Sequence, residues 1–557
     1  SEVMITTELG IEVARWQTAL AREGLQSGDR VAVMLRNCRE WIIFDQAALG
    51  LGLVVVPLYT NDRPDNVCYC LEDAGVKVLL VEGDVQWKDL WEPLAQSASL
   101  QRIVSLLPVK RPDPRLHQLD DWLGTTPADP LVEGHRDPLA LATIVYTSGT
   151  TGRPKGVMLS HHNILWNAWS GAHVVAVVPD DLFISFMPLS HTLERTGTYY
   201  LSLMAGCTVA FARSILQLGE DLQTLRPTAM ISVPRIFEKV YGRVQDQLDK
   251  KSPLVRKLFA FTVAIGWRRF LYHQGRGGWH PGFLLWPLLD RLVAHPVREK
   301  LGGRLRVAVS GGAALFQEVA QFFVGLGVAI CQGYGLTEHS PVITLNPLEN
   351  NDPASVGVAI PGLEYRIGEH HELLVRSPSV MMGYWNNPEA TAGLIDSDGW
   401  LHTGDQVRVQ GGHFYITGRI KEILVLSNGE KVPPVDMEMA ITLDPLLDQA
   451  LVAGEGKSFL AAVIVVNRDH WFAFARGLGL EPEDENTLSH KTVMRSILER
   501  IRRHTRHFPG YAQIRAVHLT LEPWTVENGL ITPTLKLRRS RIMEYHKTDL
   551  ERLFDTF

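Results

Sequence analysis

The sequence predicts an α/β protein with a large N-terminal domain of parallel α/β sheets, a small antiparallel β region and a small α+β C-terminal domain. Short apolar runs alternate with amphipathic segments before about Gly357, which is typical of parallel sheets covered by helices. After Gly357, short strand-like runs are separated by turn residues, as in antiparallel sheets. Beyond Gly418 about 135 residues remain, which is enough for a domain of their own.

The first helix and strand follow from residue spacing. Val13, Trp16 and Leu20 recur at helical intervals and predict a helix over residues 12–23. The apolar run 31–35 then suits a strand buried on both faces of a parallel sheet. The next helix is expected over 41–51. The runs that predict further parallel strands are 54–58, 77–81, 144–146 and 306–309, and those that predict the antiparallel region are 365–367, 372–375, 407–409 and 413–416.

Chain length and composition bound the class of protein. A single hydrophobic core stops growing near ~250–300 residues, so a chain of 557 residues is expected to form more than one domain. The hydrophobic fraction of 45% and the charged fraction of 21% are ordinary for globular proteins, so each domain is expected to have a packed core. The pattern changes predict a first domain over residues 1–418 and a second over 419–557.

Net charge argues against nucleic acid as a partner. The chain carries a net charge of −6, so it has no basic excess with which to neutralise phosphates.

The five cysteines do not have metal-ligand spacing and fit a reducing cytosol. The first residues show no basic region followed by an apolar run, and no run reaches the ~18–20 apolar residues of a membrane helix. The predicted location is therefore cytoplasmic.

Two apolar stretches, 267–271 and 283–289, leave peripheral membrane association open. The first also contains Arg268 and Arg269. The stretches could lie on the inner face of a membrane, or they could form a helical hairpin packed on the rest of the protein. The sequence does not decide between these interpretations, and it does not determine the oligomeric state.

The segment 146–156 carries the strongest chemical signal. It follows an apolar run and reads Tyr-Thr-Ser-Gly-Thr-Thr-Gly-Arg-Pro-Lys-Gly. Glycines let backbone N–H groups approach an anion, hydroxyl side chains add donors, and Lys155 supplies positive charge, so the segment is predicted to bind phosphate. Its spacing differs from the Gly-x-x-x-x-Gly-Lys-Ser/Thr loop. The alternative is a solvent-exposed loop without a ligand.

This segment resembles the phosphate loop of the adenylate-forming superfamily, which includes acyl-CoA synthetases, peptide-synthetase adenylation domains and luciferases. Four further segments are similar to elements of that family, in the same order: 332–338, 399–405, 418–422 and 533–537. The similarity runs from about residue 11 to the end. Segments 187–195, 233–240 and 530–536 are most similar to long-chain fatty acyl-CoA synthetases, and residues 245–300 resemble the helical insert of that branch.

The resemblance implies an ATP site built from separated segments. Glu338 would bind Mg²⁺, Thr337 would donate to the α-phosphate, and Asp405 would accept hydrogen bonds from the ribose hydroxyls. Lys536 would bridge the α-phosphate and the fatty acid carboxylate, with His191 beside that carboxylate. The other nucleotide-binding residues implied are Thr147, Ser148, Gly149, Thr150, Thr151, Gly152 and Lys155 at the phosphates, Gly311, Gly312, Ala313 and Ala314 beside the adenine, Gln332, Gly333, Tyr334 and Gly335 next to them, and Arg419 at the ribose.

The resemblance also implies that the C-terminal domain, 419–557, is mobile and rotates about a hinge at Lys421. Rotation would remove Lys536 and bring Gly429 towards the pantetheine arm of coenzyme A. The implied activity is ATP-dependent ligation of a long-chain fatty acid to coenzyme A through an acyl-adenylate, releasing AMP and pyrophosphate. Two alternatives stay open: a ligase that loads an acyl carrier protein, and an inactive nucleotide-binding scaffold.

Overall fold

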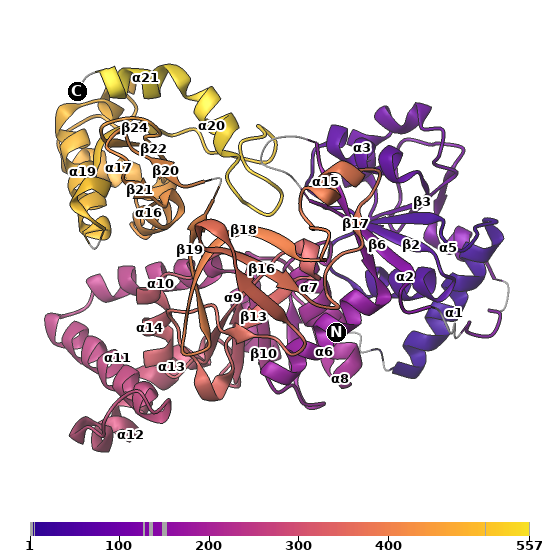
Figure 1. Ribbon diagram of the computed structural model, residues 1–557, viewed down its shortest axis with the longest axis horizontal. Coiled ribbons are helices and arrows are strands. Elements are labelled where there is room, and N and C mark those ends of the chain that lie inside the picture. Colours follow the sequence, from indigo (N-terminus) through magenta and orange to yellow (C-terminus); the bar gives the residue numbers. More distant parts are fainter. Residues whose placement is uncertain are drawn as a thin grey trace.

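A mixed eight-stranded sheet forms one half of the N-terminal part (Figure 1). The computed structural model describes residues 4, 6–125, 128–132, 137–147, 153–420, 422–506 and 508–555, and only the backbone at 485. The strand order is β17-β7-β6-β2-β1-β3-β4-β5, with β7 and β17 antiparallel to their neighbours and the rest parallel. The strands are β1 (Arg30–Met34), β2 (Val54–Pro57), β3 (Val76–Val81), β4 (Arg102–Ser105), β5 (Leu116–Gln118), β6 (Leu141–Thr147), β7 (Lys155–Ser160) and β17 (Gly383–Tyr384).

A second, seven-stranded sheet has the order β14-β13-β12-β11-β10-β8-β9. Strands β8 to β12 pair in parallel, whereas β13 and β14 are antiparallel additions at one edge. The strands are β8 (Leu182–Ser185), β9 (Thr208–Phe211), β10 (Ala229–Ser232), β11 (Val307–Ser310), β12 (Ile330–Gly335), β13 (Val342–Leu345) and β14 (Val358–Ala359). The prediction of parallel α/β sheets is confirmed.

Helices cover both faces of each large sheet. The shared core contains side chains from both sheets and from α1 (Thr6–Arg22), α2 (Arg39–Gly50) and α6 (His161–Val174). Burying such apolar side chains stabilises the fold by about 25 cal/mol per Å². The outer helices are α3 (Pro64–Ala74) and α4 (Asp84–Leu90) on the first sheet, and α9 (Leu218–Leu225), α10 (Pro234–Asp249) and α14 (Gln317–Gly325) on the second. Shorter helices are α5 (Leu119–Leu123), α7 (Thr192–Glu194) and α8 (Leu201–Ala205).

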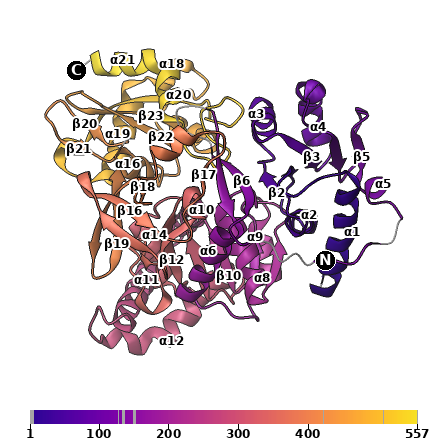
Figure 2. The same ribbon diagram turned by 45° about the vertical axis from the view of Figure 1, so that its right-hand side comes forward.

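The antiparallel region predicted after Gly357 is confirmed as a four-stranded sheet, β15-β16-β18-β19. It packs its own small core around Leu373, Val375 and Phe414. Figure 2 shows it beside the second large sheet, facing the C-terminal region. Its elements are β15 (Glu364–Ile367), β16 (Glu372–Arg376), β18 (Leu401–Gln410) and β19 (His413–Arg419), with α15 (Pro388–Ala392) nearby.

The C-terminal α+β domain has its own sheet, β22-β23-β24, and its own apolar clusters on both faces of it. Its strands are β22 (Leu447–Ala453), β23 (Leu460–Val466) and β24 (Ile514–Thr520), with the hairpin β20 (Leu424–Val425) and β21 (Lys431–Val432). Its helices are α16 (Pro434–Ile441), α17 (Arg468–Gly477), α18 (Glu485–Leu488), α19 (Lys491–Thr505), α20 (Arg539–Tyr545) and α21 (Lys547–Asp555). The exact boundary at 418 and the hinge at Lys421 stay predictions.

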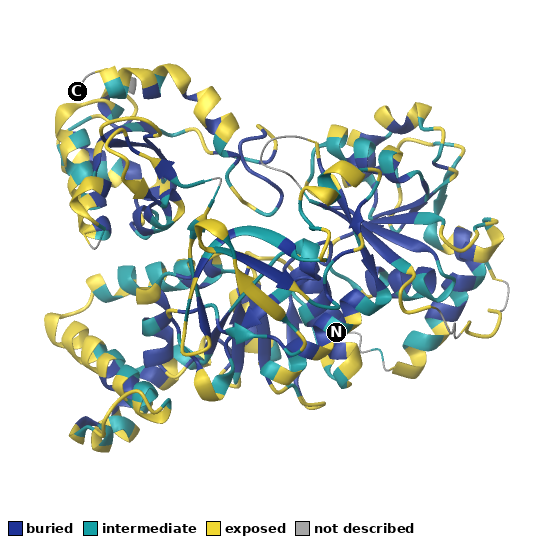
Figure 3. Ribbon diagram, in the orientation of Figure 1, coloured by how far each residue is buried: buried dark blue, intermediate teal, exposed yellow. Residues whose placement is uncertain are grey.

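The segment predicted as a helical insert is helical. Helix α11 (Pro253–His273) begins after Ser252, whose hydroxyl accepts the Val255 N–H, and is followed by α12 (Trp286–Leu289) and α13 (His295–Glu299). Figure 3 shows that much of α11 and α12 is exposed. Among the residues that the structure describes, no helix combines the length and the apolar character that crossing a bilayer would need.

Candidate active site

Asp405 joins the small antiparallel sheet to the second large sheet. Its carboxylate is buried and accepts hydrogen bonds from the Tyr334 hydroxyl (2.5 Å) and from Arg419 Nε (2.9 Å). Arg419 stands opposite Asp405 in the β18–β19 register. Gly404, at φ +71°, allows a backbone turn that other residues adopt only with strain. A carboxylate has about four acceptor positions, so Asp405 retains capacity for the hydroxyl groups of a ligand.

Glu338 and Lys155 both contact Tyr384. The Tyr384 hydroxyl donates to Glu338 Oε1 (2.8 Å), and Lys155 Nζ lies 5.1 Å from the centre of its ring. Burial and the Glu338 charge raise the pKa of Tyr384, which therefore stays a donor at neutral pH. Tyr384 is held in place because its strand, β17, pairs with β7, the strand that begins at Lys155. One side chain thus connects the predicted magnesium ligand to the predicted phosphate-binding lysine.

His191 and Thr337 lie on either side of Thr192. The hydroxyls of Thr192 and Thr337 are 3.4 Å apart, and His191 caps α7 by accepting the Leu193 N–H at Nδ1 (3.2 Å). Burial and the Lys536 ammonium lower the pKa of His191 to about 4. The imidazole is therefore neutral at pH 7, and with Nδ1 accepting, its proton is on Nε2.

Lys536 stands in the segment between β24 and α20, here called the Lys536 loop. This loop extends from the C-terminal domain towards α15 (Figure 1). Thr532 closes this loop, because its carbonyl oxygen accepts the Leu535 N–H and its hydroxyl accepts the Lys536 N–H. The Lys536 side chain is exposed, yet desolvation by the surrounding protein lowers the pKa of its ammonium; the Arg419 charge acts in the same direction, while the Glu338 and Asp405 charges oppose it. The Lys536 ammonium is thus electrostatically coupled to both predicted carboxylates.

A buried ion pair secures the Lys536 loop at its far end. Arg539 donates two hydrogen bonds to Glu438 (2.6 and 2.7 Å) and one to the Val452 carbonyl (2.8 Å). Burial raises the pKa of Glu438 to about 7, although Arg539 opposes the rise. Breaking such a pair by removing one partner costs about 3–5 kcal/mol, so this contact fixes where the loop ends.

The region predicted to face the adenine lies at the ends of β11 and β12. Gly312, Ala313 and Ala314 are exposed, whereas a Cβ at Gly311 would come within 3.1 Å of Leu193. Gln332 has a different environment, since its side chain is buried and bonded to Leu315 N and the Pro353 carbonyl. It holds the backbone of this region in place through internal hydrogen bonds.

Two glycines beside Tyr334 are required by packing. A Cβ at Gly335 would lie 1.9 Å from the Pro341 carbonyl oxygen, and one at Gly333 would lie 3.1 Å from Leu345. Their absent side chains let β12 and β13 approach closely, which places Tyr334 against Asp405.

The structure does not place every predicted residue at this site. Thr147 ends β6 opposite Lys155 in the β6–β7 register, with its hydroxyl 3.4 Å from the Lys155 carbonyl. Gly429 lies in the β20–β21 turn at φ +84°, where its N–H donates to the Leu426 carbonyl within the C-terminal domain. Ser148, Gly149, Thr150, Thr151, Gly152 and Lys421 lie outside the described residues. The roles given to all of these residues stay predictions.

Sequence reasoning missed Tyr384 and Thr192, and it gave no role to the buried groups behind His191. Arg195 pairs with Asp45 and donates to Thr143 (2.7 Å), while Glu194 accepts from Ser185 (2.6 Å). Both residues stand in the segment 187–195 that the sequence marked; the partners of Arg195 are far away in the chain, whereas Ser185 stands nine residues before Glu194. The available signal for Tyr384 was its place in the run Gly-Tyr-Trp.

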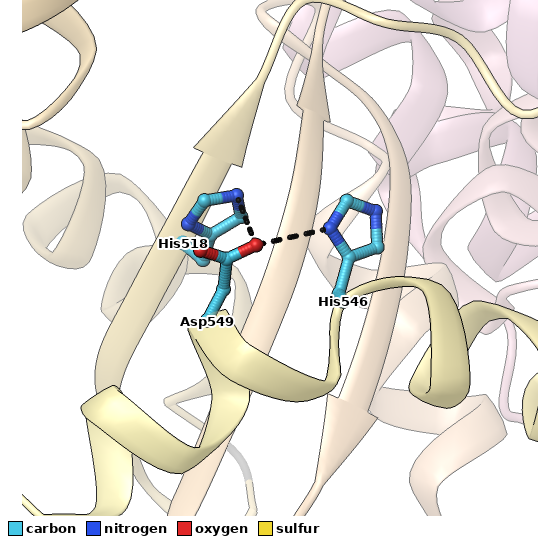
Figure 4. A group of neighbouring side chains, drawn as sticks. All are labelled: His518, His546 and Asp549. Atoms are coloured by element: carbon cyan, nitrogen blue, oxygen red, sulfur yellow. Dashed lines mark ion pairs between the residues drawn. The ribbon is translucent and has the colours of Figure 1, made fainter.

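A second polar cluster, His518, His546 and Asp549, lies between β24 and the start of α21 in the C-terminal domain (Figure 4). Asp549 is 3.5 Å from His518 Nε2 and 3.6 Å from His546 Nδ1. The Trp524 indole N–H, which can only donate, points at His546 Nε2 (3.3 Å). Neutral His546 therefore carries its proton on Nδ1, the nitrogen nearest Asp549. This tautomer directs the Nδ1 proton of His546 towards Asp549, and a metal ion bound at Nδ1 would have to displace that proton.

Replacing Tyr384 by phenylalanine tests the hydrogen bond between Tyr384 and Glu338. The variant keeps the ring beside Lys155 but removes the donor to Glu338, and a hydrogen bond to a charged group contributes ~1.5–3 kcal/mol. We expect kcat/KM for ATP to fall about tenfold, measured by pyrophosphate release at several magnesium concentrations. Tyr365→Phe, at an exposed tyrosine of β15, is the matched control. Equal ATP and magnesium dependence in both variants would contradict a role for Tyr384.

Comparison with known families covers nearly the whole chain. Residues 7–385 match the family described as AMP-binding enzyme, and residues 421–557 match the AMP-binding enzyme C-terminal domain. The long-chain-fatty-acid–CoA ligase FadD15 of Mycobacterium bovis is 32% identical over 96% of this chain and 89% of its own. The long-chain-fatty-acid–[acyl-carrier-protein] ligase AEE15 of Arabidopsis thaliana is 27% identical over 98% of this chain and 82% of its own.

A solved structure agrees in fold. The adenylation domain of a carboxylate reductase from Mycobacterium chelonae superposes with a TM-score of 0.78 at 25% identity, covering 98% of this chain and 84% of that domain. The agreement includes both the sheet-bearing N-terminal part and the C-terminal domain.

Proposed function

This chain belongs to the AMP-binding enzyme family, whose members form adenylates, and from that premise we propose that it ligates a long-chain fatty acid to coenzyme A. One observation carries the proposal. The charge of Lys536, from the C-terminal domain, is coupled to those of Glu338, between β12 and β13, and Asp405, on β18, and it lowers the pKa of His191. Separated charged groups thus converge on a volume where a carboxylate and a nucleotide triphosphate would meet.

In the first step, a carboxylate oxygen of the fatty acid attacks the α-phosphorus of ATP. The new O–P bond forms as the bond to the pyrophosphate oxygen breaks, and pyrophosphate leaves with the electron pair. Because the acid and ATP are both anions, the site must offset charge while it aligns them. Lys536 supplies that charge, and neutral His191 offers an N–H on Nε2 as an uncharged donor.

Glu338 fits a magnesium ligand in its chemistry. It is a partly exposed carboxylate with one oxygen bonded to Tyr384, so further acceptor positions remain. Magnesium commonly binds one or two carboxylates together with substrate phosphates, and it offsets phosphate charge when bound. Lys155, beside the ring of Tyr384, would contact the same phosphates.

In the second step, the thiol of coenzyme A loses its proton to solvent, its sulfur attacks the acyl carbonyl carbon, and AMP leaves with the electron pair of the broken C–O bond. Lys536 is needed only for the first step, so we propose that the C-terminal domain, 419–557, then rotates about Lys421 and brings Gly429 forward.

Long-chain acids and coenzyme A are proposed because relatives above 30% identity carry that name, while a carrier-protein ligase is a more distant match. The test supplies purified protein with ATP, magnesium and saturated acids graded in length, and follows pyrophosphate release. Thioester formation is then measured with free coenzyme A and, separately, with an acyl carrier protein. Pyrophosphate release without a coenzyme A thioester would refute the acceptor, and faster turnover of short acids would refute the chain length.

A further inference from the structure

The helical insert carries a basic and apolar surface that the adenylation chemistry does not use. We propose that this insert surface, formed by residues 250–300, which follow α10 and include α11, α12 and α13, docks on a lipid bilayer that carries anionic headgroups. The proposal does not depend on which acid the site activates. It rests on charge, on exposed apolar side chains and on the position of the insert in the fold.

The charge of the insert is opposite to that of the rest of the chain. Residues 250–300 contain ten Lys and Arg and two Asp and Glu, a net charge of +8. Because the whole chain carries −6, the remaining residues carry −14. An anionic surface would therefore attract the insert and repel the rest of the molecule, which fixes one orientation.

Exposed apolar side chains are concentrated in the same segment. Of the 32 large apolar residues that are exposed in the described part of the chain, ten fall within residues 254–292. Leu254 and Leu284 are 78% and 75% exposed, and Trp279, Leu288 and Leu292 are each more than half exposed. Such a concentration of exposed apolar side chains is typical of an interaction site. Leucine and tryptophan beside lysine and arginine are the side chains with which interfacial helices enter a headgroup layer.

The insert is anchored rigidly on its other side. In α11 only Thr262, Ile265 and Gly266 are buried. A Cβ at Gly266 would lie 1.8 Å from the Gly325 carbonyl oxygen, so α11 and α14 touch backbone to backbone at this point. Figures 1 and 3 show α11 and α12 projecting at one end of the molecule, below the C-terminal domain, with exposed residues outward. The surface is therefore presented on a fixed helix, away from the candidate active site.

A bilayer fits this surface better than a second copy of the chain. In a twofold dimer the same patch lies on both subunits, so two segments of net charge +8 would face one another. Like charges at an interface oppose association. Anionic headgroups instead offset the charge, while the acyl region accepts leucine and tryptophan side chains.

The test measures binding of the full-length protein to sedimented vesicles. We expect binding to vesicles in which about a third of the phosphatidylcholine is replaced by phosphatidylglycerol, and binding about tenfold weaker to phosphatidylcholine alone. Leu284→Glu/Leu288→Glu should weaken binding to the mixed vesicles by about tenfold or more, because it adds charge where apolar side chains enter the bilayer. Lys257→Gln/Arg291→Gln should weaken it and reduce its salt dependence.

The matched control is Ile215→Glu/Leu216→Glu, which makes the same charge change at two exposed apolar residues outside the insert. It should bind vesicles within about twofold of the unmodified protein. Pyrophosphate release with a water-soluble acid should be equal in all variants, which shows that they are folded. Equal loss of binding in the control and the insert variant would overturn the proposal. The proposal would also be overturned if the unmodified protein did not bind mixed vesicles and instead sedimented as a dimer. In that case Leu284→Glu/Leu288→Glu would dissociate the dimer.

Discussion

Replacing Lys536 by alanine is expected to slow acyl-adenylate formation by about 10²–10³-fold while sparing thioester formation from a supplied acyl-adenylate. The reason is electrostatic, since the ammonium is coupled to the charges of Glu338 and Asp405, where we propose that the two anionic substrates meet. Pyrophosphate release measures the first half-reaction, and transfer from synthetic acyl-adenylate to coenzyme A measures the second. Equal loss of both half-reactions would contradict a role restricted to adenylation.

A control and a second readout separate the role of Lys536 from effects on folding. Lys547→Ala removes a lysine from an exposed position of the same domain and should leave both half-reactions unchanged. The Lys536 ammonium also helps burial to lower the pKa of His191 to about 4, so its removal should raise that pKa. A histidine titration followed by NMR measures this shift. An unchanged His191 pKa would show that the two side chains do not approach one another in solution.

Replacing Asp405 by asparagine is expected to lower kcat/KM for ATP by about a hundredfold, mainly through KM. An amide has one oxygen where the carboxylate has two, so it cannot accept from Arg419, from Tyr334 and from two ribose hydroxyls together. Hydrogen bonds to charged groups contribute ~1.5–3 kcal/mol each, which sets the size of the effect. Steady-state kinetics and calorimetric titration with AMP measure it.

Asp398→Asn provides the matched control for Asp405, because it makes the same change at an exposed carboxylate near the start of β18. Its ATP affinity should equal that of the unmodified protein. Thermal unfolding of both variants tests whether the fold survives loss of the pair with Arg419. If folded Asp405→Asn bound AMP normally, the proposed ribose contact would be wrong.

Much of the fold could be predicted from the sequence, because local patterns carry it. The run 31–35 was predicted as a buried strand and forms β1, and the helical spacing of Val13, Trp16 and Leu20 corresponds to α1. The candidate site was harder to predict. Glu338 and Asp405 were found through their motifs, whereas Tyr384, which contacts Glu338, stands 46 residues further along the chain and is placed by the pairing of β17 with β7.

By itself, the sequence determined the α/β class, the change to antiparallel strands after Gly357 and the charged residues predicted to bind a nucleotide. Hydrophobic periodicity and turn residues act over a few positions, so they can be read without the fold. Only the tertiary structure decided that Lys536 is electrostatically coupled to Glu338 and Asp405, that Gln332 is used in internal hydrogen bonds, and that the insert exposes its leucines. These outcomes depend on how sheets and domains pack, and packing joins residues whose separation in the chain carries no local signal.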